Sequence, residues 1–227
     1  VKLHWPVVHV EAGLRSFDRA MPEEINRVAT DHISDLLLCP VHAAVAQLEQ
    51  EGLGDKAEFT GDVMLDLART VAPIAAAQDP VGRFLATGDG PTPTPLDALP
   101  AAAQRKGGYA LATVHRPANT DDPARLAAIF GALADLPWPT LLPLHPRTKA
   151  AMARHGLQAP AGLHLVPPAG PLPFQALVAG AAKVFTDSGG VQKEALFAEV
   201  PCVTLRDTTE WTETLQGGWN VLVDADP

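Results

Sequence analysis

The sequence predicts an α/β fold built on parallel sheets, and three observations support this prediction. Short apolar runs of strand length alternate with helix-length segments along the 227 residues, which is the pattern of a doubly wound sheet. Several of these runs end in polar or charged residues, as strands do where open α/β sheets bind ligands. Hydrophobic residues make up 47% of the chain, so it can bury a substantial core rather than remain disordered.

Composition narrows the possible partners. The formal net charge is −9 and no run rich in Lys and Arg occurs, which argues against a nucleic-acid partner. No apolar run approaches the roughly 18 residues of a membrane-spanning helix, and no signal peptide is visible. Cys39 and Cys202 lie in apolar runs. They are expected to be reduced core residues, which suits a cytoplasmic protein without a membrane partner.

The first apolar run, residues 6–10, predicts a buried strand that Glu11 and Arg15 follow directly. Because ligands bind at the carboxyl ends of such strands, both residues are candidates for a site. A surface ion pair would explain these two residues equally well.

A helix is expected to begin at Pro22, since proline suits the first helical position. Glu23 stands in its first turn, where it either belongs to a site or only complements the helix dipole. Apolar residues recur at helical spacing and would place His32 in the core. Further along, the sequence predicts a strand at 36–40, a helix at 41–51, a short strand and turn at 59–62, and a helix at 63–77 interrupted at Pro73.

Residues 78–106 are rich in proline and glycine and are interpreted as the segment that joins two domains, with one short helix near Leu96. This divides the chain into domains at 1–70 and 71–227. In the second domain, Asp122 is expected to cap a helix that begins at Pro123. The predicted strands of this domain are 109–114, 140–144, 163–166, 184–186, 202–205 and 220–223.

Residues 183–195 form the most informative segment and are expected to fold as strand, tight turn and helix. Ser188 is a suitable N-cap, and Gly189 and Gly190 let the backbone approach a ligand closely. A helix start presents unpaired N–H groups that favour phosphate. Glu194 follows about one turn into the helix, where its carboxylate could reach a sugar hydroxyl. An ordinary strand-to-helix turn remains the alternative, because two glycines before a helix are a weak signal.

Four predicted strands end in polar residues, and parallel strands bring such ends to one edge of a sheet. Three of the four ends have basic or helix-dipole character, which predicts an anion site. No Walker motif, Gly-x-Gly-x-x-Gly motif or zinc-ligand spacing occurs, so ordinary NTP, NAD and metal sites are disfavoured. The residues at these ends are His115-Arg116, His145, Ser188 and Arg206.

Five segments occur in a fixed order: His9 to Ser16, Met21 to Arg27, His115-Arg116, Thr186 to Gln192, and Arg206 to Glu210. Together they resemble the non-hydrolysing bacterial UDP-N-acetylglucosamine 2-epimerases, and the resemblance runs from Val7 to Asp224. It implies a glycosyltransferase-B-like (GT-B) pair of Rossmann-like domains, the first incomplete. It also implies a homodimer without metal or nicotinamide cofactor that interconverts UDP-N-acetylglucosamine and UDP-N-acetylmannosamine (EC 5.1.3.14). The product would supply cell-surface polysaccharide.

The resemblance also implies roles for particular residues. Catalytic roles fall to Glu11, Glu23 and His115. Arg116 and His145 could belong to an allosteric UDP-sugar site. The remaining positions implied to bind the UDP-sugar are Arg15, Arg116, Phe174 near the uracil, Ser188, Gly189, Gly190, Glu194 and Arg206.

Relative to the family pattern, strand–helix units before Val7 and helices after Pro227 are missing, along with an arginine, a lysine and a third acid of the active site. Ala118 stands where an acid is expected, which weakens the regulatory interpretation. We therefore expect this chain alone to be inactive. A GT-B glycosyltransferase, a hydrolysing epimerase relative and a non-catalytic UDP-sugar-binding fragment stay open as alternatives.

Overall fold

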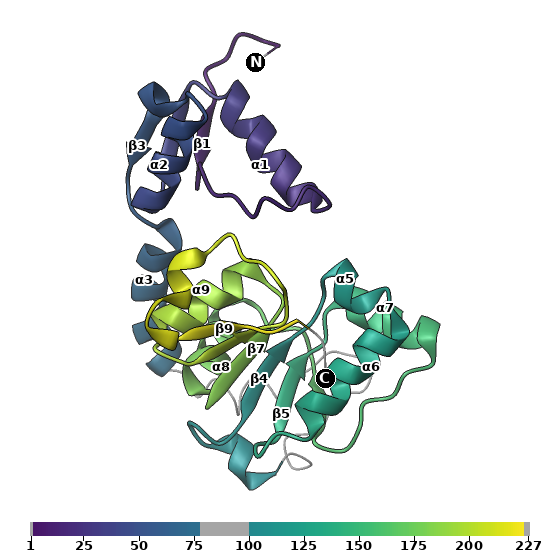
Figure 1. Cartoon of the computed structure of the whole chain (residues 1–227). Helices are drawn as coiled ribbons and strands as arrows, with labels where there is room; N and C mark the ends of the chain where they lie inside the picture. Colours follow the sequence, from purple (N-terminus) through teal and green to yellow (C-terminus); the bar gives the residue numbers. More distant parts are fainter. Residues whose placement is uncertain (1, 78–99, 225–227) are drawn as a thin grey trace. The chain divides into compact units, whose positions relative to one another are not determined.

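The computed structural model describes residues 2–77 and 100–224. The chain forms two compact units, each considered by itself below (Figure 1). Unit 1 comprises Val1–Leu67 and Thr208–Trp211, and unit 2 comprises Ala68–Asp207 and Thr212–Pro227. The helix expected near Leu96 lies outside the described residues, and the joining segment ends in a short 3-10 helix, η3 (Ala101–Gln104).

Unit 1 is a three-stranded parallel sheet in the order β1-β2-β3. Its core packs Leu37 and Cys39 of the central strand against Ala44 and Leu48 of α2, and Trp211 from the returning segment joins them. Return of that short segment to unit 1 was not foreseen in the sequence. Its elements are β1 (Val8–Val10), α1 (Pro22–Ile33), β2 (Leu36–Cys39), α2 (His42–Gln50), η1 (Gly54–Lys56) and β3 (Ala57–Phe59). Helix α3 (Val63–Ala77) begins in unit 1 and continues into unit 2.

Two predictions about the helices of this part of the chain are wrong. His32 is exposed rather than buried, because α1 turns acidic residues inward and leaves Ile25 and Ile33 41% and 54% exposed. Helix α3 is not interrupted at Pro73 but runs through it. Proline removes one backbone N–H, and at this exposed position the carbonyl that loses its partner can bond water instead.

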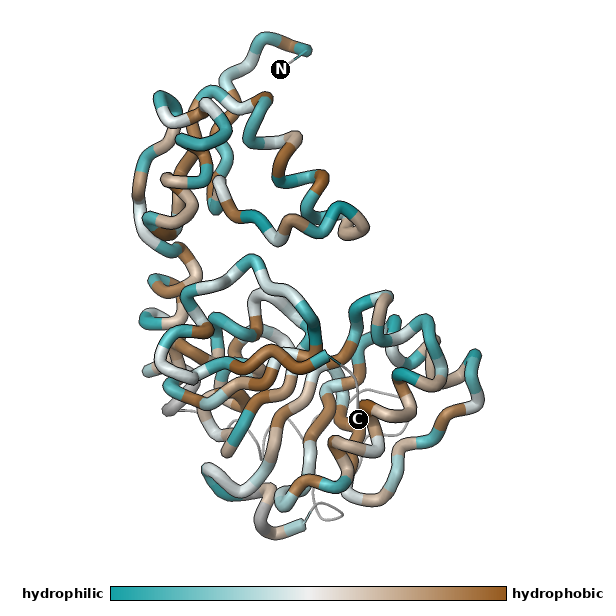
Figure 2. Tube along the Cα trace, viewed as in Figure 1, coloured by the Kyte–Doolittle hydropathy of each residue, from teal (hydrophilic) through white to brown (hydrophobic). Residues whose placement is uncertain are grey.

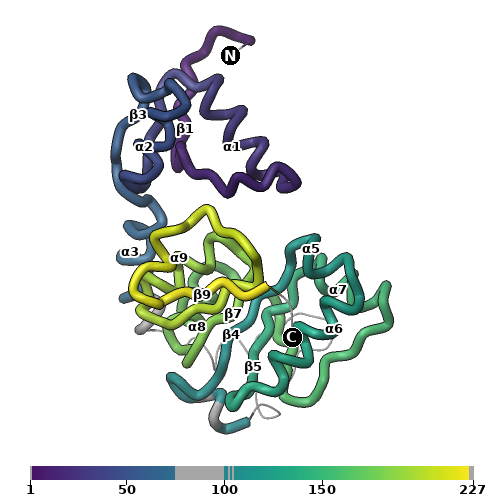
Figure 3. Tube along the Cα trace, viewed as in Figure 1, coloured from purple at the N-terminus to yellow at the C-terminus, as the bar shows by residue number. Residues whose placement is uncertain are grey.

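Unit 2 is a six-stranded, fully parallel sheet in the order β6-β5-β4-β7-β8-β9. In chain order this is 3-2-1-4-5-6, the arrangement of the doubly wound nucleotide-binding fold, and the order reverses between β4 and β7. Figure 3 follows the chain through it, from teal β4 to yellow β9. Its elements are β4 (Ala110–Thr113), α5 (Pro117–Thr120), α6 (Pro123–Ala134), β5 (Thr140–Pro143), α7 (Pro146–His155), β6 (Leu163–Val166), α8 (Pro171–Gly180), β7 (Lys183–Thr186), α9 (Gly189–Phe197), β8 (Cys202–Thr204), η4 (Thr212–Gly218) and β9 (Asn220–Leu222).

Helices cover both faces of this sheet. Leu111 and Val184 pack with α8 and α9 on one face, whereas Ala112 and Leu142 pack with α6 and α7 on the other. Figure 2 shows the hydrophobic residues concentrated along these strands. Successive strand residues point to opposite faces, so one buried strand serves two apolar layers.

The predictions for Asp122 and for the two cysteines are confirmed. Asp122 caps α6 by accepting hydrogen bonds from the N–H groups of Ala124 and Arg125. Cys39 and Cys202 are buried free thiols, and burial raises their pKa values to about 11 and about 12. Across the described residues, no helix is long and apolar enough to cross a membrane.

Candidate nucleotide and sugar site

The carboxyl ends of four neighbouring strands gather the polar residues of unit 2. His145 follows β5, His115 follows β4, Ser188 follows β7 and Arg206 follows β8 closely, and these strands are consecutive neighbours in the sheet. The expected convergence on one edge is therefore confirmed. The edge includes the point between β4 and β7 where strand order reverses, which is where doubly wound sheets bind their ligands.

Asp187 fixes the backbone at this reversal point. Its buried carboxylate accepts hydrogen bonds from the N–H groups of His115 (2.8 Å) and Arg116 (2.8 Å) and from the side chain of Asn119 (3.1 Å). Below it, the hydroxyls of Thr113 and Thr186 bond across the two strands at 2.6 Å. The two loops that leave β4 and β7 are thus tied together.

Sequence reasoning missed Asp187 and Asn119 as parts of the site. The position of Asp187 was a usable signal, because a carboxylate between a buried strand and a helix N-cap requires hydrogen-bond donors. The donors are the backbone N–H groups of His115 and Arg116, which follow the adjacent strand. Which strand is adjacent is a property of the topology, so the sequence alone did not identify the partner.

Two histidine rings lie together at the same edge. The ring centroids of His115 and His145 are 4.9 Å apart. Nδ1 of His115 lies 3.3 Å from a carboxylate oxygen of Asp187, which favours a proton on that nitrogen. Nδ1 of His145 accepts a hydrogen bond from the N–H of Arg147 and so caps α7. His145 therefore has a structural task beside any role in binding.

The turn into α9 leaves helix N–H groups available to a ligand. Ser188 occupies the N-cap position, as expected, but its side chain makes no capping hydrogen bond. Its own N–H donates instead to the hydroxyl of Thr186 at 2.9 Å. Gly189 is buried in the first turn, so the backbone there carries no side chain that would keep an anion away.

Glu194 lies one turn further along α9. Its Oε2 atom is buried and has no hydrogen-bond partner among the described residues. Burial raises the pKa of this carboxyl to about 7. A buried acceptor without a donor is costly, and a ligand hydroxyl would supply the missing donor.

The other residues expected in unit 2 border this edge. Arg206 is 8% exposed directly after β8, and Phe174 in the first turn of α8 is partly buried against the core beneath. Arg116 is the N-cap residue of α5. Their contacts with a ligand stay predictions.

Unit 1 holds the two candidate catalytic acids. Glu11 follows β1 in the left-handed conformation, with φ of 65°, which is strained for a residue with a side chain. Glu23 lies exposed in the first turn of α1. The adjacent Glu24 is buried and accepts hydrogen bonds from the N–H groups of Ser16 (2.9 Å) and Phe17 (3.0 Å).

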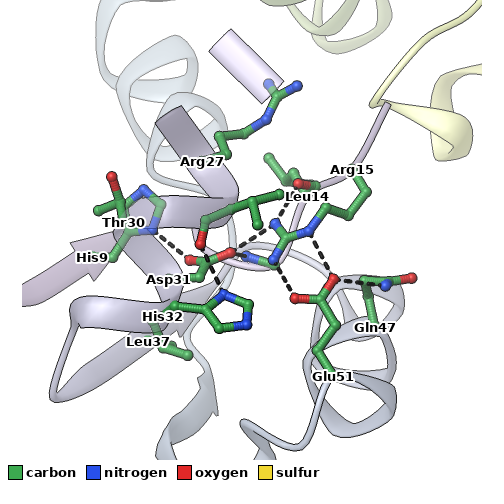
Figure 4. A network of polar contacts seen from close by, with 12 residues as sticks. His9, Leu14, Arg15, Arg27, Thr30, Asp31, His32, Leu37, Gln47 and Glu51 are labelled. Carbon is green, nitrogen blue, oxygen red and sulfur yellow. Dashed lines mark hydrogen bonds and ion pairs between the residues drawn. The ribbon is translucent and has the colours of Figure 1, made fainter. Parts of the chain in front are cut away.

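Figure 4 shows a second polar network, around Asp31 and Arg15. The guanidinium of Arg15 lies 2.7 Å from Asp31 and donates two hydrogen bonds to Glu51, at 2.9 and 2.7 Å. Burial would raise the pKa of Asp31, but its bonds with His9 and Arg15 outweigh this effect and lower it. The side chain of Arg15 is 3% exposed, and its guanidinium is bonded to protein partners. Its contact with substrate stays a prediction.

The fold places unit 2 in the class of doubly wound α/β domains, in which nucleotides commonly bind at a helix N-terminus on this edge of the sheet. Comparison with known proteins is more specific. The family model of UDP-N-acetylglucosamine 2-epimerases matches residues 1–227, and the chain belongs to this family.

Relatives extend well beyond this chain. It is 45% identical to the UDP-2,3-diacetamido-2,3-dideoxy-D-glucuronate 2-epimerase of Pseudomonas aeruginosa, covering 99% of this chain and 58% of that protein. The crystal structure of Methanocaldococcus jannaschii UDP-GlcNAc 2-epimerase in complex with UDP-GlcNAc and UDP superposes with a TM-score of 0.84 at 37% identity, covering 99% and 60%. The Neisseria meningitidis UDP-GlcNAc 2-epimerase bound to UDP-GlcNAc superposes with a TM-score of 0.78 at 26% identity, covering 97% and 58%. The chain thus spans about three fifths of their lengths.

Proposed function

We propose that this chain provides the nucleotide-binding unit and two proton-transfer acids of an enzyme that inverts C2 of a UDP-linked 2-acetamido sugar. The proposed reaction interconverts UDP-N-acetylglucosamine and UDP-N-acetylmannosamine in the cytoplasm, for cell-surface polysaccharide, in a homodimer. The observation that carries the proposal is the edge of unit 2, where the uncapped start of α9 stands one turn before the buried, partnerless oxygen of Glu194. Phosphate suits the first feature and a sugar hydroxyl suits the second.

The chemistry requires two neighbouring carbons of the sugar, C1 and C2, to react in sequence. The hydrogen on C2 is barely acidic, so the bond from C1 to the diphosphate oxygen loosens first and positive charge develops at C1. A carboxylate then removes the C2 proton, giving a 2-acetamidoglucal and UDP. Return of UDP to C1 with protonation of C2 on the opposite face completes the inversion, and atoms balance because UDP both leaves and returns.

Residues of this chain suit each part of that sequence. The N–H groups that begin α9, with His115 and Arg206, stabilise the charge that develops on the departing diphosphate. Glu11 and Glu23 take up and return protons as general base and general acid. These roles require no metal, and in the described part of the chain no group of three potential ligand residues gathers.

Binding of UDP is the direct test of the site in unit 2. Titration calorimetry of the chain with UDP should give a saturable signal, and Gly189→Val should weaken it more than tenfold, on the order of 1.4 kcal/mol. The reason is that a branched side chain at the buried first turn would keep the diphosphate from the backbone. Equal affinity in a folded Gly189→Val protein would contradict the assignment.

Turnover is tested in a protein that carries these residues together with the segments present in the longer relatives. We expect conversion of UDP-N-acetylglucosamine to UDP-N-acetylmannosamine, followed by NMR of the anomeric and C2 protons. Release of free N-acetylmannosamine would instead indicate a hydrolysing enzyme, and transfer of the sugar to an acceptor would indicate a glycosyltransferase. Binding without any turnover would leave a UDP-sugar-binding protein.

A second substrate is favoured by one comparison. The P. aeruginosa relative at 45% identity is named for a UDP-2,3-diacetamido-glucuronate, which shares the UDP group and the acetamido group on C2. We propose this sugar as the alternative, and parallel assays with both substrates decide between them by the ratio of their kcat/KM values.

A further inference from the structure

Helix α1 has an unusual inward face. Its buried residues are both acids, Glu24 and Asp31, which are 3% and 0% exposed. They are seven residues apart, so they lie two turns apart on the same side of the helix. Buried carboxylates are retained when they have several donors, and all the donors that this structure gives Asp31 come from one segment of the chain.

Asp31 holds that segment at three points. His9 contributes Nδ1 at 2.5 Å, Gly13 its N–H at 3.2 Å and Arg15 its guanidinium at 2.7 Å. Glu11 lies between the first two of these points. Figure 4 shows His9 and Arg15 reaching the same carboxylate from two sides.

The ends of the network are anchored as well. Arg15 is held from its other side by Glu51, directly after α2. Glu24 takes the next two N–H groups of the segment, those of Ser16 and Phe17. Two carboxylates of α1, those of Glu24 and Asp31, therefore hold residues 9–17 against the helix, and its first turn also carries the exposed Glu23.

We propose that Asp31 is a positioning residue, which keeps Glu11 in its strained left-handed conformation and at a fixed place relative to Glu23. This deepens the proposed function, because it matters for the reaction only if Glu11 and Glu23 move protons. The physical basis is that a left-handed residue with a side chain costs about 1–2 kcal/mol and persists only when its surroundings determine it. The bonds from Asp31 to His9 and Gly13, on either side of Glu11, restrain the backbone in this conformation.

The test uses Asp31→Asn in the whole chain, read by NMR. Asparagine keeps the shape and one acceptor oxygen but loses the charge that Arg15 and His9 face. A residue with positive φ shows a strong intraresidue contact between its amide and α protons, and we expect Glu11 to lose this signature. Exchange of the Gly13 amide should rise at least tenfold, whereas the Ser16 and Phe17 amides should change little.

Glu24→Gln provides the converse, with faster exchange at Ser16 and Phe17 and an unchanged signature at Glu11. Asp55→Asn, an exposed acid of the same unit, should alter none of these signals. Retention of the left-handed signature in folded Asp31→Asn would overturn the proposal. If Asp31→Asn does not fold, Glu51→Gln is used instead, because Glu51 contacts Arg15 and not Asp31 itself. In Glu51→Gln the exchange rate of the Gly13 amide should rise at least threefold. An unchanged exchange rate would overturn the proposal.

The outcome is separable from that of the proposed function. UDP titration of the same samples reports on unit 2, and Asp31→Asn should bind UDP as the unaltered chain does. Absence of UDP binding in the unaltered chain would remove the proposed function, while the signals of Glu11 and Gly13 would still decide whether Asp31 positions them.

Discussion

The buried carboxyl of Glu194 makes UDP binding depend on pH. Its pKa is raised by burial to about 7, so the free protein holds a proton there below neutral pH. A carboxylate that accepts hydroxyl hydrogens from a ligand is favoured in its charged form, and binding should therefore release that proton.

The affinity for UDP should thus increase as the pH rises from 6 to 8, by up to about tenfold from this group. The diphosphate titrates in this range too, so the comparison is with Glu194→Gln, in which only the ligand's contribution remains. Calorimetry at several pH values measures both proteins. Parallel pH profiles for the two would show that Glu194 does not meet the ligand.

Glu194 also makes the stability of the ligand-free protein depend on pH, and this stability falls as the pH rises, whereas the affinity for UDP increases. A folded-state pKa above the unfolded value near 4.5 contributes stability that is complete below about pH 4.5 and is lost as the pH rises through about 7. Without ligand, the Tm of the unaltered protein should therefore fall relative to Glu194→Gln between pH 6 and pH 8.

The two acids of unit 1 give a prediction about turnover. In the longer protein that carries these residues, Glu11→Gln or Glu23→Gln should reduce kcat at least ~100-fold, because an amide cannot exchange protons with C2. The affinity for UDP, measured by calorimetry, should stay within about threefold, since the residues proposed to hold the diphosphate, Ser188, Gly189 and Arg206, lie in unit 2. Normal turnover in Glu23→Gln would return that residue to dipole compensation, the alternative interpretation of its place in the first turn of α1.

At the scale of elements, the turn after β1 depends on one glycine. Gly13 has φ of 79°, and a Cβ atom there would lie 2.5 Å from the carbonyl oxygen of Ala44 in α2. Gly52 has a similar φ of 75° but open space around it. The two positions share a positive φ and differ in the room for a side chain.

Gly13→Ala should therefore destabilise the protein more than Gly52→Ala does. Both carry the cost of a left-handed alanine, about 1 kcal/mol, and the contact with rigid backbone should add at least about 1 kcal/mol at Gly13. Urea unfolding measures the difference between the two variants. Equal destabilisation would mean that α2 moves aside without cost.

Elements were more predictable than the contacts between them. Strands such as β2 and β6 are apolar runs bounded by turn residues, and the Asp122 cap of α6 follows from local chemistry, so the sequence alone predicted them. Helix α1 was misjudged because its apolar spacing suggested a buried apolar face, whereas its inward face is set by donors in residues 9–17, which lie 7 to 22 residues away in sequence. Asp187 and Asp31 were missed for the same reason, since neither partner set is local.

At the scale of the whole molecule, the two units differ in how completely their sheets are covered. In unit 2, helices pack on both faces of six strands. In unit 1, the edge strand β1 leaves Val8 and Val10 51% and 48% exposed. Exposed apolar residues contribute little to stability, and an open apolar edge favours association.

We therefore expect unit 2 to carry most of the stability of this chain. Hydrogen exchange followed by mass spectrometry in increasing urea should show peptides of unit 1 opening at lower urea than those of unit 2. Added UDP should protect unit 2 peptides first, because a ligand stabilises the state that binds it. The 227-residue chain by itself should bind UDP weakly and show no epimerisation, since Glu11 and Glu23 belong to the less stable unit, whose sheet has an exposed apolar edge. Opening of both units at the same urea concentration would contradict the expected difference in stability. Turnover equal to that of the longer relatives would show that Glu11 and Glu23 are fully active in this chain.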